Sequence, residues 1–343
     1  MNYQFHRIPN LLRPLTWYRW LTGLAAGAVW LGASPVLLFF WCWLAQSGRE
    51  TKVAVDMTKQ ISDDESLPIP RNRSPLTYFV LTFALSIPFW IAGALTDFQI
   101  LPGIPLSALG LLCMVGAASI LVYRENGATG VADLLKRSFD FKRVQVKIWY
   151  APTFLLMPVI MILSFIMMRL AGNQLPSPQF SFATPFILFA VFFIAAIGEE
   201  LGWSGYAIDP LQDRFGALGG ALVLGIVWAV WHFIPLLSVK RSTEWIAWWL
   251  FGTVALRVII TWLYNNTEQS VFIAVIFHAM FNVTWQLFPI NGSYYDPRVT
   301  SLITAAVAVF VVIVWGPRTM VRTQSAGNTG LKEAVSSVDE VGR

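Results

Sequence analysis

Residues 183–206 read ATPFILFAVFFIAAIGEELGWSGY, an apolar run that ends in two adjacent glutamates. A membrane-spanning helix needs about 20 mostly apolar residues, and this segment is long enough. A charged side chain at membrane depth costs about 2.5 to 3.5 kcal/mol and usually faces a protein interior. The segment therefore predicts a membrane protein with a functional site at Glu199 and Glu200.

The composition of the whole chain agrees with this prediction. Of the 343 residues, 56% are hydrophobic and 13% are charged, whereas a soluble domain has about a quarter charged residues. The net charge of +5 is accounted for by basic loops at a membrane surface, so no nucleic-acid partner is implied. Cys42 and Cys113 both lie in apolar runs, which argues against a disulfide framework.

Eight further apolar stretches bring the total to about nine. In chain order the nine are residues 19–45, 76–96, 103–123, 148–170, 183–206, 216–237, 244–264, 271–288 and 299–316. We therefore expect an all-α, polytopic transmembrane helical bundle of about eight to nine membrane helices, with a conical or bundle-interior active-site cavity. Apolar residues at helical spacing over residues 131–139 predict a short helix on the membrane surface. The expected location is a bacterial plasma membrane.

Further polar residues lie within the later spans. His278 and Asn282 are four residues apart, so they share one helical face and can contact one ligand together. Trp228 and His232 have the same spacing, which predicts that the indole packs beside the imidazole. Adjacent Glu199 and Glu200 differ by about 100° around a helix and cannot point the same way, so we expect different roles. The predicted boundaries place Glu199 and His232 on opposite sides of the midplane, and the spacing leaves open whether they meet.

At these residues the sequence resembles the CPBP family, which comprises CAAX prenyl protease 2 and the bacteriocin-processing (Abi) intramembrane proteases. The family carries Glu-Glu-x-x-x-Arg, aromatic-x-x-x-His and His-x-x-x-Asn on successive membrane helices. The matching pairs here are Glu199 and Glu200, Trp228 and His232, and His278 and Asn282. The resemblance covers about residues 183–288, and its strength lies in the order of the three motifs.

One position departs from the family pattern. Ser204 stands four residues after Glu200, where the family has arginine, so the cation that would hold Glu200 is missing from the motif. Arg257 lies inside the seventh span and is the candidate replacement, because an unpaired arginine in a membrane is itself costly. Arg214 is a weaker candidate because it sits in the loop that follows the fifth span.

The resemblance implies an intramembrane endopeptidase that acts on a membrane-associated peptide or lipidated protein, of prenylated or leader type. In this interpretation Glu199 and His232 activate a water, while His278 and Asn282 donate hydrogen bonds to the oxyanion. The scheme requires no cofactor. The alternative is zinc bound by Glu199, His232 and His278, with a water as fourth ligand. The chain lacks the two histidines on one helix that His-Glu-x-x-His enzymes use.

The expected organisation follows from the spans and the resemblance. It has an N-terminal membrane helix and polar loop, the first part of the bundle with the surface helix, a CPBP-like catalytic core, a last membrane helix and a disordered cytoplasmic tail. These are residues 1–75, 76–182, 183–290, 291–317 and 318–343. Basic residues gather in alternate loops and in the tail, which predicts a cytoplasmic C-terminus.

Two other functions remain open at this point. The missing arginine at Ser204 leaves room for an inactive family member that acts as a membrane scaffold or bacteriocin-immunity factor. A transporter would also use charges within the membrane, but the sequence contains no internal repeat of the kind that many transporters have.

Overall fold

The structure is a computed structural model and describes residues 73–321. The span predicted at residues 19–45, the loop that follows it and the tail after residue 321 lie outside the described residues. The helices are α2 Pro75–Ala94, α3 Leu112–Lys136, α4 Tyr150–Leu170, α5 Thr184–Gly202, α6 Ile208–Ser238, α7 Thr243–Asn265, α8 Val271–Leu287 and α9 Pro297–Trp315. Shorter elements are the hairpin strands β1 Gln99–Leu101 and β2 Ile104–Pro105, the 3₁₀ helices η1 Leu106–Leu111, η2 Arg137–Phe139, η3 Phe141–Arg143 and η4 Lys147–Trp149, and the π-helix η5 Trp203–Ala207. The predicted all-α membrane bundle is confirmed.

Among residues 73–321, six helical segments are long and apolar enough to cross a membrane. One of them, Thr184–Ser238, has 55 residues and contains α5, η5 and α6. Gly216 breaks α6, since its φ of 71° lies outside the helical region. With 17 residues, α8 is shorter than a typical span. The described residues therefore form a multi-pass membrane protein, and the number of eight to nine crossings stays a prediction.

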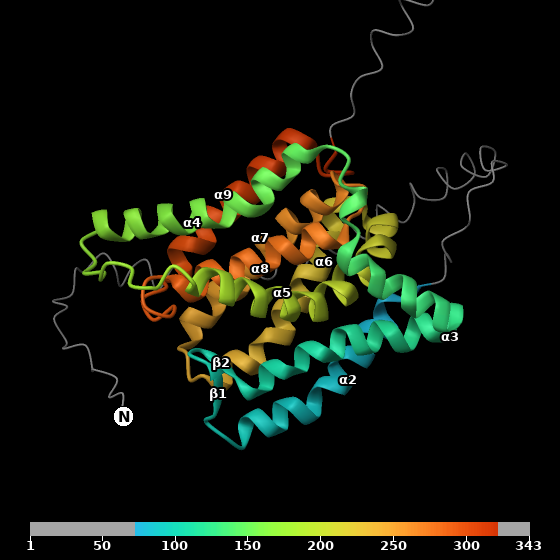
Figure 1. Cartoon of the computed structure of the whole chain (residues 1–343), viewed down its shortest axis with the longest axis horizontal. Helices are drawn as coiled ribbons and strands as arrows, with labels where there is room; N and C mark the ends of the chain where they lie inside the picture. The colour runs from blue at the N-terminus through green and yellow to red at the C-terminus, as the bar shows by residue number, and fades with distance from the viewer. Residues whose placement is uncertain (1–72, 322–343) are drawn as a thin grey trace, which may run out of the picture. The chain divides into compact units, whose positions relative to one another are not determined.

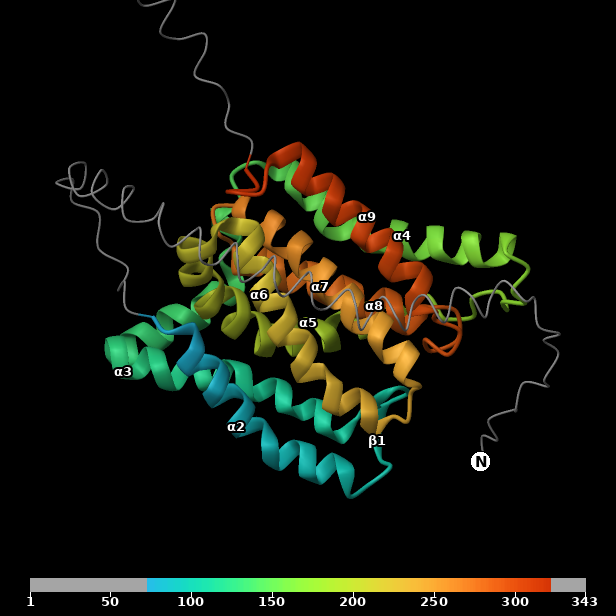
Figure 2. The same ribbon diagram turned by 180° about the vertical axis from the view of Figure 1, so that it is seen from behind.

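The helices that carry the predicted site lie in the middle of the described region. Figures 1 and 2 show α2 beside α3 at one side and α4 beside α9 at the other, with α5, α6, α7 and α8 between these pairs. Direct contacts join α5 to α8 and α6 to α7. All the predicted site residues are therefore on neighbouring helices.

The helix starts follow from local sequence signals. The side chains of Ser242 and Ser270 accept hydrogen bonds from the backbone N–H groups three residues later, at the starts of α7 and α8. Asp296 caps α9 in a similar way. Such caps satisfy backbone donors that a helix leaves unpaired at its first turn. Local chemistry thus determines where these helices begin.

A glycine allows α5 to approach its neighbours closely. A Cβ atom at Gly202 would lie 2.9 Å from the carbonyl oxygen of Met114 and would also collide with the hydroxyl of Tyr78. Any larger residue would push the end of α5 away from α2 and α3. Because Gly202 follows Glu200 by two residues, this contact helps to place the glutamates.

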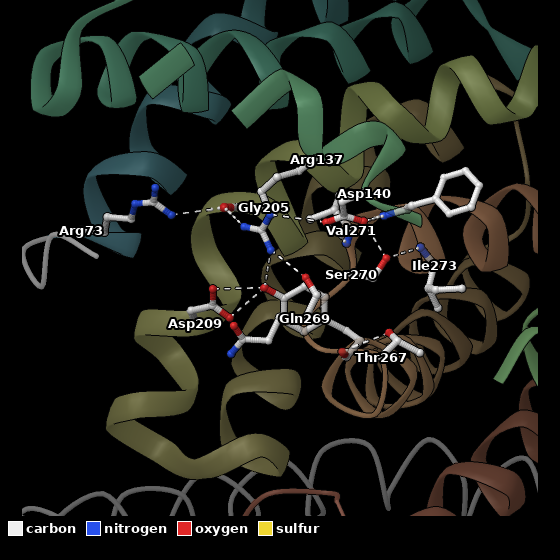
Figure 3. A network of polar contacts seen from close by, with 12 residues as sticks. Arg73, Arg137, Asp140, Gly205, Asp209, Thr267, Gln269, Ser270, Val271 and Ile273 are labelled. Carbon is white, nitrogen blue, oxygen red and sulfur yellow. Dashed lines mark hydrogen bonds and ion pairs between the residues drawn. The ribbon is translucent and has the colours of Figure 1, made fainter. Parts of the chain in front are cut away.

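A polar network ties the ends of the central elements together (Figure 3). Arg137 donates hydrogen bonds to the carbonyl oxygens of Gly205 and Gln269 and to the hydroxyl of Tyr264. Asp140 accepts hydrogen bonds from the backbone N–H groups of Val271 and Phe272, at the start of α8. A carboxylate there is also favoured by the helix dipole. The network fixes η5, α7 and α8 relative to one another.

Two predicted segments differ in detail from the structure. The predicted surface helix is present as the last part of α3, separated from the membrane segment by Gly127, whose φ is 66°. Its Leu134 is buried in the core, so this segment packs on the bundle. The first residues predicted to belong to a disordered tail, 318–321, are described by the structure, and the carbonyls of Arg318 and Met320 accept hydrogen bonds from Ala217 and Asn266. Backbone pairing across the fold is invisible in the local composition of a polar tail.

Candidate active site

The two predicted glutamates lie at the end of α5, inside the protein. Glu199 is 6% exposed and Glu200 is 0% exposed. The chain continues directly into the π-helix η5, a type of segment that often occurs at functional sites. In this segment Ser204 donates a hydrogen bond to Oε2 of Glu200. Ser204, which stands where the family motif has arginine, therefore contacts the second glutamate.

Arg257 supplies the cation that the motif lacks. Its Nη1 lies 2.8 Å from Oε2 of Glu200, and its Nη2 lies 2.9 Å from Oε1. This is a two-pronged arginine–carboxylate pair, the strongest geometry for such an interaction, and it is fully buried. The prediction that Arg257 pairs with Glu200 is confirmed. Arg214 lies against the ring of Phe215 instead.

Ser204, which replaces the arginine of the family motif, contacts both Glu200 and Arg257. Its hydroxyl lies 3.4 Å from Nη1 of Arg257 while it donates to Glu200. Position 204 thus faces both members of the ion pair. The guanidinium reaches the carboxylate from α7 rather than from the helix that carries the glutamates.

Trp228 on α6 is at the centre of the site. Its Nε1 donates a hydrogen bond of 2.9 Å to Oε2 of Glu199. Its ring packs against His232, as predicted, with 5.5 Å between the ring centroids, and against His278 at 5.1 Å. The guanidinium carbon of Arg257 lies 4.3 Å from the Trp228 ring centroid. The spacing in the sequence predicted only the contact with His232, because the other three partners lie on different helices.

The hydrogen-bond partners of the two histidines indicate their tautomers. Nδ1 of His232 lies 3.0 Å from the carbonyl oxygen of Trp228, which can only accept, so Nδ1 carries the proton and Nε2 of the neutral ring is an acceptor. Nδ1 of His278 lies 3.0 Å from Oε1 of Glu200. The other ring nitrogen of His278 lies 3.9 Å from Oε1 of Glu199. His278 therefore stands between the two carboxylates.

A cavity of about 260 Å³ adjoins these residues and is lined by Glu199, His232 and Asn282. The sequence placed Glu199 and His232 on opposite sides of the membrane midplane and left open whether they meet. Both side chains line this one cavity. Glu200, Arg257 and His278 do not line it. The rest of its wall is mainly apolar and includes residues that the sequence did not single out, namely Trp231, Arg241, Trp245, Trp249 and Trp285.

The zinc alternative, with Glu199, His232 and His278 as ligands, stays a prediction. Among residues 73–321, no three His, Cys, Asp or Glu side chains are placed as ligands of one metal ion. One ring nitrogen of His232 is held by a backbone carbonyl, and one of His278 by Glu200. In both rings the other nitrogen, Nε2, is left for another partner, as in histidines that bind a metal.

Comparison with known proteins agrees with the motifs. Residues 181–284 match the family described as type II CAAX prenyl endopeptidase Rce1-like, and this range contains all three motifs. The chain is also 29% identical over 256 residues to the CAAX prenyl protease 2 of Methanococcus maripaludis. That match covers 69% of this chain and 94% of the archaeal protein. Together these matches confirm the resemblance drawn from Glu199 to Asn282.

Proposed function

We propose that this chain, a membrane protease of the CPBP family, hydrolyses a peptide bond of a membrane-associated substrate in the cavity lined by Glu199. One observation carries the proposal: a carboxylate, an imidazole and a neutral amide, from Glu199, His232 and Asn282, line the same mainly apolar cavity. These are the groups needed to activate a water and to stabilise an oxyanion.

Glu199 is the proposed general base. Trp228 binds Oε2 of this carboxylate, which fixes its orientation and leaves Oε1 to accept a proton from the attacking water. The second acceptor for that water is Nε2 of His232. After attack on the scissile carbonyl, protonated Glu199 returns the proton to the leaving nitrogen, so the same carboxyl serves first as base and then as acid.

Asn282 is the proposed oxyanion donor, and His278 is assigned a positioning role. Asn282 lines the cavity, whereas His278, one turn earlier on α8, lies between Glu199 and Glu200. This proposal narrows the sequence-based interpretation, in which both residues donate to the oxyanion. Glu200, which is paired with Arg257, holds His278 in place through the contact with its Nδ1.

Asn282→Ala is expected to lower kcat by about 10²- to 10³-fold, the usual effect of removing one oxyanion donor. KM should change little, because the donor acts mainly on the charge that develops in the transition state. Steady-state cleavage assays on protein in liposomes measure both constants. Thr284→Val on the same helix is the control, since the Thr284 hydroxyl bonds only backbone carbonyls of its own helix. A drop of less than about fivefold for Asn282→Ala would count against the assignment.

The proposed substrate class is a lipidated protein that ends in a C-a-a-X sequence, with a prenyl group on the cysteine. The mainly apolar cavity suits aliphatic side chains, and the archaeal relative carries the name CAAX prenyl protease 2. The direct test incubates the full chain, reconstituted in liposomes, with a farnesylated peptide of this type and identifies the products by mass spectrometry. Cleavage of an unlipidated leader peptide but not of the farnesylated one would overturn this substrate class.

Exhaustive chelation is expected to leave the cleavage rate within about twofold of that of the untreated enzyme, because the proposed base and donors are all protein groups. The measurement compares protein dialysed against a strong chelator with an undialysed sample, using the same peptide. Loss of activity that returns on addition of zinc would show that the metal-free scheme is wrong.

The alternative of an inactive scaffold loses its main argument. It depended on the absence of a cation beside Glu200, and Arg257 provides one. The described residues therefore favour the enzyme.

A further inference from the structure

Arg241 is a cation in the wall of the cavity. It lies in the turn between α6 and α7 and lines the same cavity as Glu199 and His232. Its guanidinium carbon lies 4.8 Å from the centroid of the Trp245 ring. Within residues 73–321 it forms no ion pair with an acidic side chain. Its neighbour Lys240 differs, because it is exposed and pairs with Asp97 at 2.9 Å.

The surroundings of Arg241 are poorly suited to a charge without a partner. Burial lowers the pKa of Arg241, yet arginine remains protonated at physiological pH. A partly desolvated cation gains free energy when an anion approaches it. Stacking on an indole occupies the face of the guanidinium and leaves its N–H groups at the edge to bind a carboxylate in two-pronged fashion.

A stretch of mainly apolar cavity wall lies between His232 and Arg241 in the sequence. Arg241 follows the end of α6 at Ser238 by three residues, and both His232 and Arg241 line the cavity. The cavity wall between these points is formed by Pro235, Leu236 and Val239, which suit aliphatic side chains.

We propose that Arg241 binds the free C-terminal carboxylate of the substrate and thereby selects chains that end beside the cavity. This inference rests on the proposed function and adds a residue that determines specificity. The wall between the two anchor points receives the aliphatic side chains, while the scissile carbonyl lies beside Glu199 and His232.

The test compares two farnesylated peptides that differ only at the C-terminus, one a carboxylate and the other a carboxamide. The wild-type chain is expected to cleave the carboxylate with a kcat/KM about tenfold or more above that of the amide, the size of one charge-assisted hydrogen-bond pair. Arg241→Met should lower cleavage of the carboxylate to the level of the amide. Lys240→Met, which removes the neighbouring positive charge, should keep the full preference.

A binding measurement separates this proposal from the proposed function. The Glu199→Gln chain is titrated with the fluorescently labelled C-terminal tripeptide as acid and as amide, with and without Arg241→Met. A preference for the acid that disappears with Arg241→Met supports the carboxylate site even if neither farnesylated peptide is cleaved. Equal binding of acid and amide, or a preference that survives Arg241→Met, overturns it.

Discussion

Glu199→Gln is expected to lower kcat/KM for the farnesylated peptide by about 10²- to 10⁴-fold, the usual contribution of a general base. The glutamine amide has nearly the same shape, and its carbonyl oxygen can still accept the hydrogen bond from Trp228 Nε1. It cannot take a proton from water. The chain should therefore insert and fold normally while cleavage is lost.

Two measurements together check this prediction. Cleavage is followed by mass spectrometry of the peptide products, and folding by size-exclusion chromatography and thermal unfolding in detergent. Glu244→Gln is the matched control, since Glu244 is an exposed glutamate at the start of α7, and its activity should stay within about twofold of wild type. A Glu199→Gln chain that retains a tenth of the wild-type rate would remove Glu199 from the role of base.

Arg257→Leu should abolish cleavage and destabilise the fold by about 3 to 5 kcal/mol. The substitution leaves Glu200 as an uncompensated charge in a site where both partners are fully buried. It also removes the support of His278, which is bonded to the same carboxylate oxygen as Nη2 of Arg257. Unfolding in denaturant, monitored in detergent, measures the stability, and the peptide assay measures the activity.

A second substitution tests whether the loss in Arg257→Leu comes from the missing positive charge. Adding Ser204→Arg to Arg257→Leu should restore part of both stability and activity, because position 204 already contacts Glu200. The combination returns the cation to the position where the family motif has it. Arg214→Leu is the control and should leave activity unchanged, since Arg214 lies against Phe215. If Ser204→Arg recovers nothing, the role assigned to this pair is wrong.

The sequence was sufficient to predict the helices and to point to the residues of the site. A membrane leaves no water to satisfy backbone groups, so an apolar stretch must become a helix, and most predicted spans agree with the observed bounds to within a few residues. The exceptions are instructive. Glycines at 127 and 216 break two long helices, and residues 317 and 318, at the start of the predicted tail, pair with the backbone of α6.

The sequence by itself determined the class of protein, the helical segments and the residues that could carry the chemistry, because each of these depends on local composition and short spacings. It also named Arg257 as a partner for Glu200. Only the tertiary structure decided that they meet across 57 positions of the chain, that Trp228 contacts four polar residues, and that Arg241 shares the cavity of Glu199. Such contacts depend on how each helix is rotated and packed against its neighbours, and no periodicity within a single segment contains that information.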